Sequence, residues 1–188
     1  NELGGKLQPG QTLLSIIAGA RIATLTRELQ HPQVVRAMPN TPAQVGEGMT
    51  VWTATPEVVA EARSKVQAIL QSLGREIFMA DEKYLDMATA VSGSGPAYVF
   101  LFIEAMIDAA VHVGLPRDTA RELVLQTMSG SVRLARETGK HPAELKNMVT
   151  SPGGTTAEAL LQLEEGGLRN TVAQAIISAY EKSRQLGG

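Results

Sequence analysis

The chain changes its pattern near residue 81, and this change limits the folds that it can adopt. Before that point, short apolar runs alternate with segments whose apolar residues recur at helical spacing. Strands that alternate with helices through short connections predict parallel βαβ units. After that point no convincing strand pattern recurs, so we expect an α/β domain over residues 1–81 and an all-helical domain over residues 82–188. The expected strands are 12–17, 34–38, 49–53 and 75–79, with helices over 22–29 and 55–73.

The helical half contains one helix that is apolar around most of its circumference. It follows the break Ser92-Gly93-Ser94-Gly95-Pro96 and runs from Pro96 to Val113. A helix with so wide an apolar arc requires burial on two sides, which predicts the centre of a bundle or a subunit interface. The apolar run from Ala97 to Val113 also carries Glu104 and Asp108 and is short for a bilayer span. We therefore expect a soluble protein without a membrane partner.

Composition argues against several other classes of function. The 188 residues carry a net charge of −2 without a basic run, which argues against a nucleic-acid partner. There is no cysteine, so a disulfide scaffold is excluded and a cytoplasmic location is favoured. The histidines at 31, 112 and 141 have no partner at ligand spacing, so we expect no metal. The chain starts at Asn1, without a methionine or a signal peptide, and reads as a fragment.

A candidate anion site lies in Ser151-Pro152-Gly153-Gly154-Thr155-Thr156, which leads directly into a helical pattern. Glycines allow backbone N–H groups to approach a ligand closely, and the start of a helix offers unpaired N–H groups and a partial positive charge. Thr155 and Glu158 have the spacing of a capping box, which places the helix start at Thr155. Phosphate and carboxylate both suit such a site, and a simple turn with a helix cap is the alternative.

The ends of the first two strands offer a second candidate site. Ligands of open parallel sheets bind at the carboxyl ends of the strands, and here these ends are Ile17-Ala18-Gly19 and Met38-Pro39-Asn40. The Asn40 amide could bind a carboxamide or a ribose hydroxyl, with ordinary turn chemistry as the alternative. The sheet resembles the second half of a nucleotide-binding sheet, although no glycine-rich dinucleotide or P-loop motif occurs in the chain. Ser92 and Ser94 do not form a nucleophile elbow.

Four stretches together resemble the pyrroline-5-carboxylate reductase family across essentially the whole chain. They are 38–42 (MPNTP), 92–98 (SGSGPAY), 114–116 (GLP) and 145–156 (LKNMVTSPGGTT). The resemblance implies the C-terminal half of a Rossmann-type parallel sheet, followed by a helical dimerisation and substrate-binding domain. It also implies a homodimer, which can assemble further into a decamer. The implied reaction is NADPH-dependent (or NADH-dependent) reduction of 1-pyrroline-5-carboxylate to L-proline, the final step of proline biosynthesis.

The resemblance also implies roles for individual residues. The substrate carboxylate would be held by residues 151–156, called the signature loop below, so that carboxylate is favoured over phosphate. Thr156 is the candidate hydrogen-bond or proton donor. The implied cofactor contacts are Ile16, Ile17, Ala18, Met38, Pro39, Asn40 and Glu82, and the implied substrate contacts are Ser151, Gly153, Gly154, Thr155 and Thr156. The family's glycine fingerprint and cofactor-selecting loop would lie upstream of Asn1, so the preference between NADPH and NADH stays open. Some family members carry a cofactor-binding Asn where this chain has Met148.

Two alternatives remain beside this interpretation. Hydroxyacid dehydrogenases related to 6-phosphogluconate dehydrogenase have a similar outline but need a catalytic lysine, and residues 94–114 contain neither Lys nor Arg. The second alternative is a non-catalytic helical dimerisation fragment of such a reductase, inactive without its missing N-terminal half.

Overall fold

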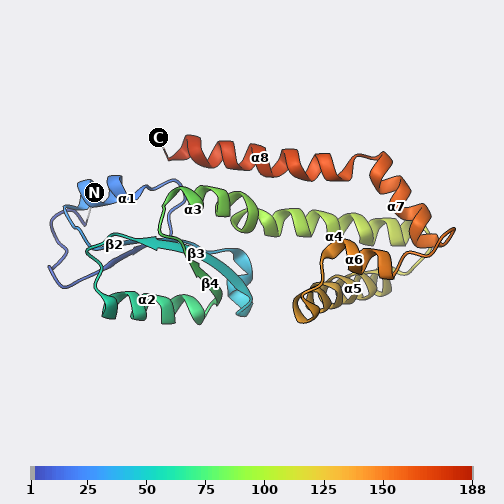
Figure 1. Cartoon of the computed structure of the whole chain (residues 1–188), viewed down its shortest axis with the longest axis horizontal. Coiled ribbons are helices and arrows are strands. Elements are labelled where there is room, and N and C mark those ends of the chain that lie inside the picture. Colours follow the sequence, from blue (N-terminus) through green and yellow to red (C-terminus); the bar gives the residue numbers. More distant parts are fainter. Residues whose placement is uncertain (1–2, 188) are drawn as a thin grey trace. The chain divides into compact units, whose positions relative to one another are not determined.

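The computed structural model describes residues 3–187 (Figure 1). The chain divides into two compact units. The first comprises Asn1–Pro96 together with Gln174–Gly188, and the second comprises Ala97–Ala173. The expected boundary at residue 81 stays a prediction, and the two units are described separately below.

The first unit is built on a four-stranded sheet with the strand order β1-β2-β3-β4. Its strands are β1 (Leu13–Ser15), β2 (Val34–Met38), β3 (Gly48–Ala54) and β4 (Gly74–Phe78). Helix α1 (Ile22–Leu29) connects β1 to β2, and α2 (Ala60–Gln71) connects β3 to β4. Both of these connected pairs are parallel, as expected for βαβ units. The α/β class predicted for this half is therefore confirmed.

One strand pair differs from the prediction of an all-parallel sheet. Strands β2 and β3 pair antiparallel, with Ala37 opposite Trp52. The connection between them holds only the short 3₁₀ helix η1 (Thr41–Val45). A parallel pair needs a crossover of a dozen or more residues, and this connection is shorter than that. The chain therefore turns back directly, and β3 starts at the edge of the sheet where β2 ends.

Helix α2 begins later than Thr55, where the sequence predicted its start. The Thr55 side chain is used elsewhere: its hydroxyl donates to the Pro32 carbonyl (2.7 Å) and accepts from the Val34 amide (3.2 Å). It therefore joins the end of β3 to the start of β2 and does not cap a helix. The helix starts at Ala60 instead, after a turn, with Val59 at its N-cap and no side-chain cap.

The core of the first unit lies between α2 and one face of the sheet (Figure 1). Alternate residues of neighbouring strands share a face of a sheet, and here Val35 and Ala37 share one with Trp52. Leu70 and Val66 of α2 cover them. The opposite face carries Arg36, which is buried, and packs against α3 (Lys83–Ala88). The sheet thus has an apolar face and a face with a buried charge.

The stretch 92–96 was predicted to break the helix, but the helical backbone continues through it. Helix α3 continues through the π-helical segment η2 (Thr89–Gly93) into α4 (Gly95–His112). In this segment the Ser94 amide donates to the Thr89 carbonyl (2.7 Å), so the turn is one residue wider than in an α-helix. The helical backbone therefore spans Lys83–His112. By length and composition alone, this stretch of the described residues could cross a membrane, unlike the shorter run considered from the sequence.

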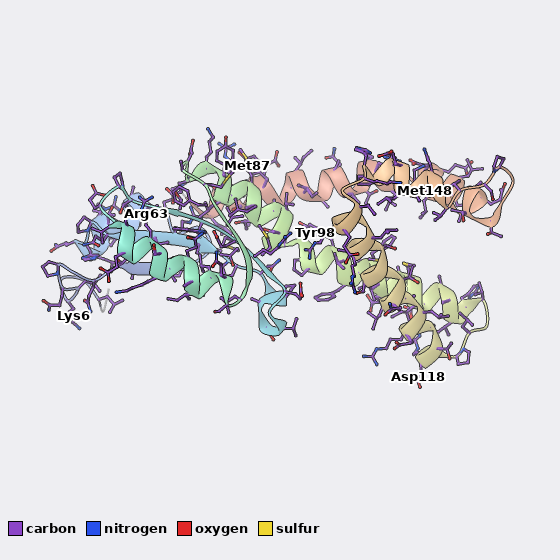
Figure 2. The ribbon with its side chains drawn as sticks, turned by 60° about the horizontal axis from the view of Figure 1, so that its bottom comes forward. Lys6, Arg63, Met87, Tyr98, Asp118 and Met148 are labelled. Atoms are coloured by element: carbon purple, nitrogen blue, oxygen red, sulfur yellow. The ribbon has the colours of Figure 1, made fainter. Side chains whose placement is uncertain are left out.

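The second unit is helical, as predicted. It contains most of α4, then α5 (Arg117–Thr138), α6 (Pro142–Met148), α7 (Thr155–Glu165) and the start of α8 (Leu168–Leu186). Among its described residues only Ala120 and Val124 are buried. The large apolar side chains of α4, such as Phe100 and Leu101, are exposed within the single chain. Figure 2 shows the side chains that project from these helices, among them Tyr98 and Met148.

An aromatic cluster on the α2 side of the sheet yields a prediction about acid stability. Trp52 and Phe78 pack edge to face with ring centroids 4.9 Å apart, and the guanidinium of Arg63, labelled in Figure 2, lies over the Phe78 ring. The Trp52 indole donates to Glu76 Oε2 (2.6 Å), and Gln67 donates to the other carboxylate oxygen (2.7 Å). These hydrogen bonds lower the pKa of Glu76 below its usual value of 4.5, and the bond from Trp52 has the largest effect.

We expect the charged Glu76 carboxylate to stabilise the fold above pH 4.5 and this contribution to disappear as the pH falls through its lowered pKa. The difference in unfolding free energy between the wild type and Glu76→Gln should therefore shrink as the pH is lowered from 7 to 3.5. Urea unfolding at several pH values measures it, with Glu57→Gln, an exposed acid next to the same helix, as the control. A wild-type-to-variant difference that is constant with pH would contradict the assignment.

Candidate functional site

The loop after β1 exposes two large apolar side chains. Strand β1 ends at the buried Ser15, and Ile16 and Ile17 are 59% and 63% exposed directly after it. The Ser15 hydroxyl accepts a weak hydrogen bond from the Ile17 amide (3.4 Å). Exposed isoleucines are unfavourable in water, and they lie at the carboxyl end of a strand, where open sheets bind nucleotides. This loop, residues 16–21, is the first element of the candidate cofactor site.

The end of β2 lies at the same edge of the sheet, because β1 and β2 run parallel. Met38 is its last residue, and Pro39 and Asn40 follow. Met38 also approaches the π-helical segment: a Cβ added to Gly93 would lie 3.1 Å from Met38 Cε. The structure therefore brings together the predicted cofactor residues of the first two strands and the glycine-rich stretch 92–96.

The Asn40 side chain connects three segments at this edge. Its Nδ2 donates to the Ser92 carbonyl (3.0 Å), and its Oδ1 accepts from the Met49 amide (2.8 Å) at the start of β3. The Ser92 carbonyl is the acceptor that residue 96 would reach in a regular α-helix, but proline has no N–H. Asn40 thus supplies the missing donor. One amide hydrogen and one lone pair of Asn40 remain for a ligand.

Glu82, implied as a residue near the nucleotide site, has a defined place in the first unit. Its Oε1 accepts from the Ile22 amide (2.8 Å) at the start of α1 and pairs with Arg36 Nη1 (2.8 Å). A carboxylate at a helix N-terminus is favourable because of the helix dipole. Glu82 therefore fixes the start of α1, just after the loop 16–21. Its contact with a cofactor stays a prediction.

The signature loop forms the start of α7 in the second unit. The predicted capping box is wrong, because Thr155 is the first helical residue and the N-cap is Gly154, without a side-chain cap. Gly153 has a φ of +67°, which favours glycine. A Cβ on Gly154 would lie 2.5 Å from Ser151 Oγ, so Ser151 occupies the space beside this glycine. Among the described residues, the Thr155 and Thr156 hydroxyls have no hydrogen-bond partner.

The short helix α6, just before this loop, is capped completely. His141 Nδ1 accepts from the Ala143 amide (3.2 Å), and Glu144 Oε2 accepts from the His141 amide (3.1 Å). The sequence analysis found no metal partner for His141 but missed this reciprocal cap, which the Glu three residues after His141 could have indicated. The Thr150 hydroxyl donates to the Lys146 carbonyl (2.7 Å) and tightens the end of α6. α6 thus ends in a well-defined turn before Ser151.

The predicted site residues form two groups. The cofactor residues lie at one edge of the sheet in the first unit, and the substrate residues lie at the start of α7 in the second.

Sequence reasoning did not single out Arg21, Arg36, Asp86 or Ser183, which form a cluster on the charged face of the sheet. The sequence feature that could have indicated this cluster is Arg36, a charged residue within an otherwise apolar strand. The residues that the structure describes hold no group of three or more metal-binding side chains.

A sheet with Rossmann-type βαβ units, followed by a helical unit, is an architecture found in nicotinamide-dependent oxidoreductases, and the comparisons place the chain in that class. A family model for the pyrroline-5-carboxylate reductase dimerisation domain matches residues 82–186, more than half of the chain. The chain belongs to the pyrroline-5-carboxylate reductase family, whose members are NAD(P)H-dependent oxidoreductases. The match to a dimerisation domain agrees with the exposed apolar side chains of α4 and supports a homodimer.

Individual relatives support the same assignment. Pyrroline-5-carboxylate reductase from Synechocystis is 43% identical over 98% of this chain and 68% of its own length. The enzyme from Escherichia coli is 44% identical over 99% of this chain and 69% of its own length. The crystal structure of Plasmodium falciparum pyrroline carboxylate reductase with NADP bound matches with a TM-score of 0.90 and 40% identity, over 95% of this chain and 72% of that one. The chain thus spans about two thirds of the length of its relatives.

The bond between Asn40 and Ser92 can be tested with a double-mutant cycle. Asn40→Ala leaves the partly buried Ser92 carbonyl without a donor, and an unsatisfied buried group costs about 1–3 kcal/mol. In the background of Pro96→Ala, the alanine N–H can donate to that carbonyl, so Asn40→Ala should cost about 1 kcal/mol less there. Urea unfolding of the four proteins measures the coupling. Equal costs in both backgrounds would show that Asn40 does not replace the missing proline donor.

Proposed function

We propose that this chain carries the substrate-binding loop and part of the cofactor site of a reductase that converts 1-pyrroline-5-carboxylate to L-proline. The observation that carries the proposal is the start of α7, where the family's signature loop leaves the helix without a side-chain cap. The first N–H groups of a helix have no partner within it, and together with the helix dipole they suit a carboxylate. Membership of the reductase family supports the choice of carboxylate over phosphate.

The residues at the sheet edge fit a nicotinamide cofactor. Ile16 and Ile17 offer an apolar surface for a ring, and Asn40 retains one donor and one acceptor. When bound, the reduced nicotinamide supplies the hydride. The task of the chain is to orient the reactants and exclude water from them. We propose Ile16, Ile17, Ala18, Met38, Pro39, Asn40 and Glu82 as the cofactor side of the site.

The substrate side consists of the signature loop. The backbone N–H groups of Thr155 and Thr156 would hold the carboxylate, with Ser151, Gly153 and Gly154 shaping the loop around it. The Thr156 hydroxyl is half-buried and makes no internal hydrogen bond among the described residues, so it is free to donate to the ring nitrogen. Donation to the lone pair of the imine nitrogen of the substrate, and transfer of that proton, would stabilise the negative charge that this nitrogen gains when the C=N carbon is reduced. We assign Thr156 this role, either as donor or as part of a proton relay from water.

The assembly and location follow the family. We propose a sheet domain over residues 1–81 and a helical dimerisation and substrate-binding domain over residues 82–188, the latter beginning where the dimerisation match begins. We also propose that the dimers can form a decamer and that the enzyme works in the cytoplasm. NADPH is the proposed cofactor, and NADH is the alternative.

Replacement of Thr156 tests the assignment of its hydroxyl. Thr156→Val keeps the shape and the backbone N–H groups but removes one hydrogen bond to a charged group, worth about 1.5–3 kcal/mol. In a reductase that contains this chain, kcat/KM should fall roughly ten- to a hundredfold while the KM for the cofactor changes little. Steady-state kinetics with pyrroline-5-carboxylate measures it. Thr155→Val, at the exposed neighbouring hydroxyl, is the matched control, and equal effects of the two variants would remove the special role of Thr156.

The two glycines of the loop should respond for different reasons. Gly154→Ala places a methyl group 2.5 Å from Ser151 Oγ and should weaken substrate binding, and Ser151→Ala should partly restore it because it removes that oxygen. Gly153→Ala meets no atom within 4 Å, so only its φ of +67° opposes the change. Substrate KM values of the three variants and the double variant decide this. Failure of Ser151→Ala to improve Gly154→Ala would show that contact with Ser151 is not the cause.

Calorimetric titration with NADPH separates the proposal from the non-catalytic alternative. The residues 1–188 lack a glycine-rich phosphate-binding turn. We therefore expect little or no NADPH binding by this chain alone, and restored binding and activity when the preceding part of a close relative is fused to it. If that fusion formed a folded dimer but had no activity, the alternative of a non-catalytic dimerisation fragment would be favoured. Tight binding by residues 1–188 alone would mean that the cofactor site is complete without that turn.

A further inference from the structure

The loop 16–21 is in direct contact with the last turn of α8 within the first unit. Gly19 has a φ of +78°, and a Cβ built on it would lie 2.8 Å from the Leu186 carbonyl oxygen. Arg21 Nε donates to the Gly187 carbonyl (2.9 Å). The backbone of the loop therefore packs against the end of α8 without room for a side chain at position 19.

A buried carboxylate strengthens this contact. Asp86 is 3% exposed, and its Oδ2 lies 3.6 Å from Arg21 Nη2. Its Oδ1 accepts from the Ser183 hydroxyl of α8 (3.2 Å) and lies 3.5 Å from Arg36 Nη2 of β2. Asp86 thus connects the loop, the sheet and α8. A buried carboxylate is stable only with such partners, so the four groups hold one arrangement.

We propose that the last turn of α8, through Arg21 and Asp86, is a positioning element that orders the loop 16–21 and so raises the affinity for the cofactor. This inference depends on the proposed function, which assigns Ile16–Ala18 to the cofactor site. Ile16 and Ile17 are exposed, so the order of the loop comes from its ends: Ser15 on one side and Gly19 and Arg21 on the other. A loop that is ordered before binding loses less conformational entropy when the ligand arrives.

Amide hydrogen exchange tests the structural part without any ligand. The reporters are the amides of Ala20 and Ile22, which donate to the Ile17 carbonyl (3.3 Å) and to Glu82 (2.8 Å). Arg21→Ala and Gly19→Ala should each raise their exchange about tenfold or more, because hydrogen bonds to charged groups and close packing are lost. Ser183→Ala should have a smaller effect. Arg21→Lys, which keeps the charge beside Asp86, should lie between Arg21→Ala and the wild type.

Three matched variants control for unspecific effects. Arg27→Ala removes an exposed arginine from α1. Gly46→Ala has nearly the same φ, +75°, but meets no atom within 4 Å. Ser178→Ala removes an exposed hydroxyl from α8, five residues before Ser183. These three should leave the exchange of Ala20 and Ile22 as in the wild type. Exchange in Arg21→Ala and Gly19→Ala no faster than in their controls would overturn the inference.

Kinetics of a reductase containing this chain test the functional part. Arg21→Ala and Gly19→Ala should raise the KM for the cofactor about tenfold, with kcat at saturating cofactor and the KM for the substrate nearly unchanged. Faster exchange with an unchanged cofactor KM would overturn the positioning role. Loss of kcat at saturating cofactor would overturn it as well. If the unmutated reductase that contains this chain did not bind the cofactor, that result would refute the proposed function. The exchange experiment would still decide whether α8 orders the loop.

Discussion

The first unit depends on a buried arginine. Arg36 lies in the second strand of the sheet and is only 2% exposed. A guanidinium is always charged in proteins, and burying it is unfavourable unless anions and hydrogen bonds surround it. Glu82 and Asp86 supply those anions, both from the segment that follows the sheet. This need brings α3 onto the charged face of the sheet, while the apolar face is covered by α2.

The same ions position the candidate cofactor site. Glu82 binds Arg36 and the first amide of α1, so the charge in the sheet also fixes the helix that follows the loop 16–21. Asp86 binds Arg36, Arg21 and Ser183, and this brings the end of α8 to the other side of that loop. Asn40 holds the opposite side of the sheet edge against the π-helical segment. The edge proposed for the cofactor is therefore supported mainly by polar contacts, whereas the apolar core lies under α2.

Much of this arrangement could be predicted from the sequence. Alternating apolar runs predicted the four strands and both helices between them, because burial requires those periods. The antiparallel pairing of β2 and β3 was not predicted, although the loop 39–47 is too short for a parallel crossover. The helix start at Thr55 was wrong for a different reason: a good capping residue was used for a tertiary contact instead. At residues 92–96 the Ser92 carbonyl receives its donor from Asn40, which is more than fifty residues distant, and local patterns do not contain such information.

Helices α6 and α7, which follow one another in the helical unit, differ in how their first N–H groups are satisfied. Helix α6 has seven residues and still begins with a complete reciprocal cap, made by His141 and Glu144. Helix α7 has eleven residues, yet it begins at Gly154 with no side-chain cap, although Ser151, Thr155 and Thr156 lie within reach in sequence. A hydroxyl at the position of Gly154 would accept from one of these N–H groups and stabilise the helix by about a few tenths of a kcal/mol. Glycine at that position leaves the N–H groups without a side-chain acceptor, which suits the carboxylate proposed to bind there.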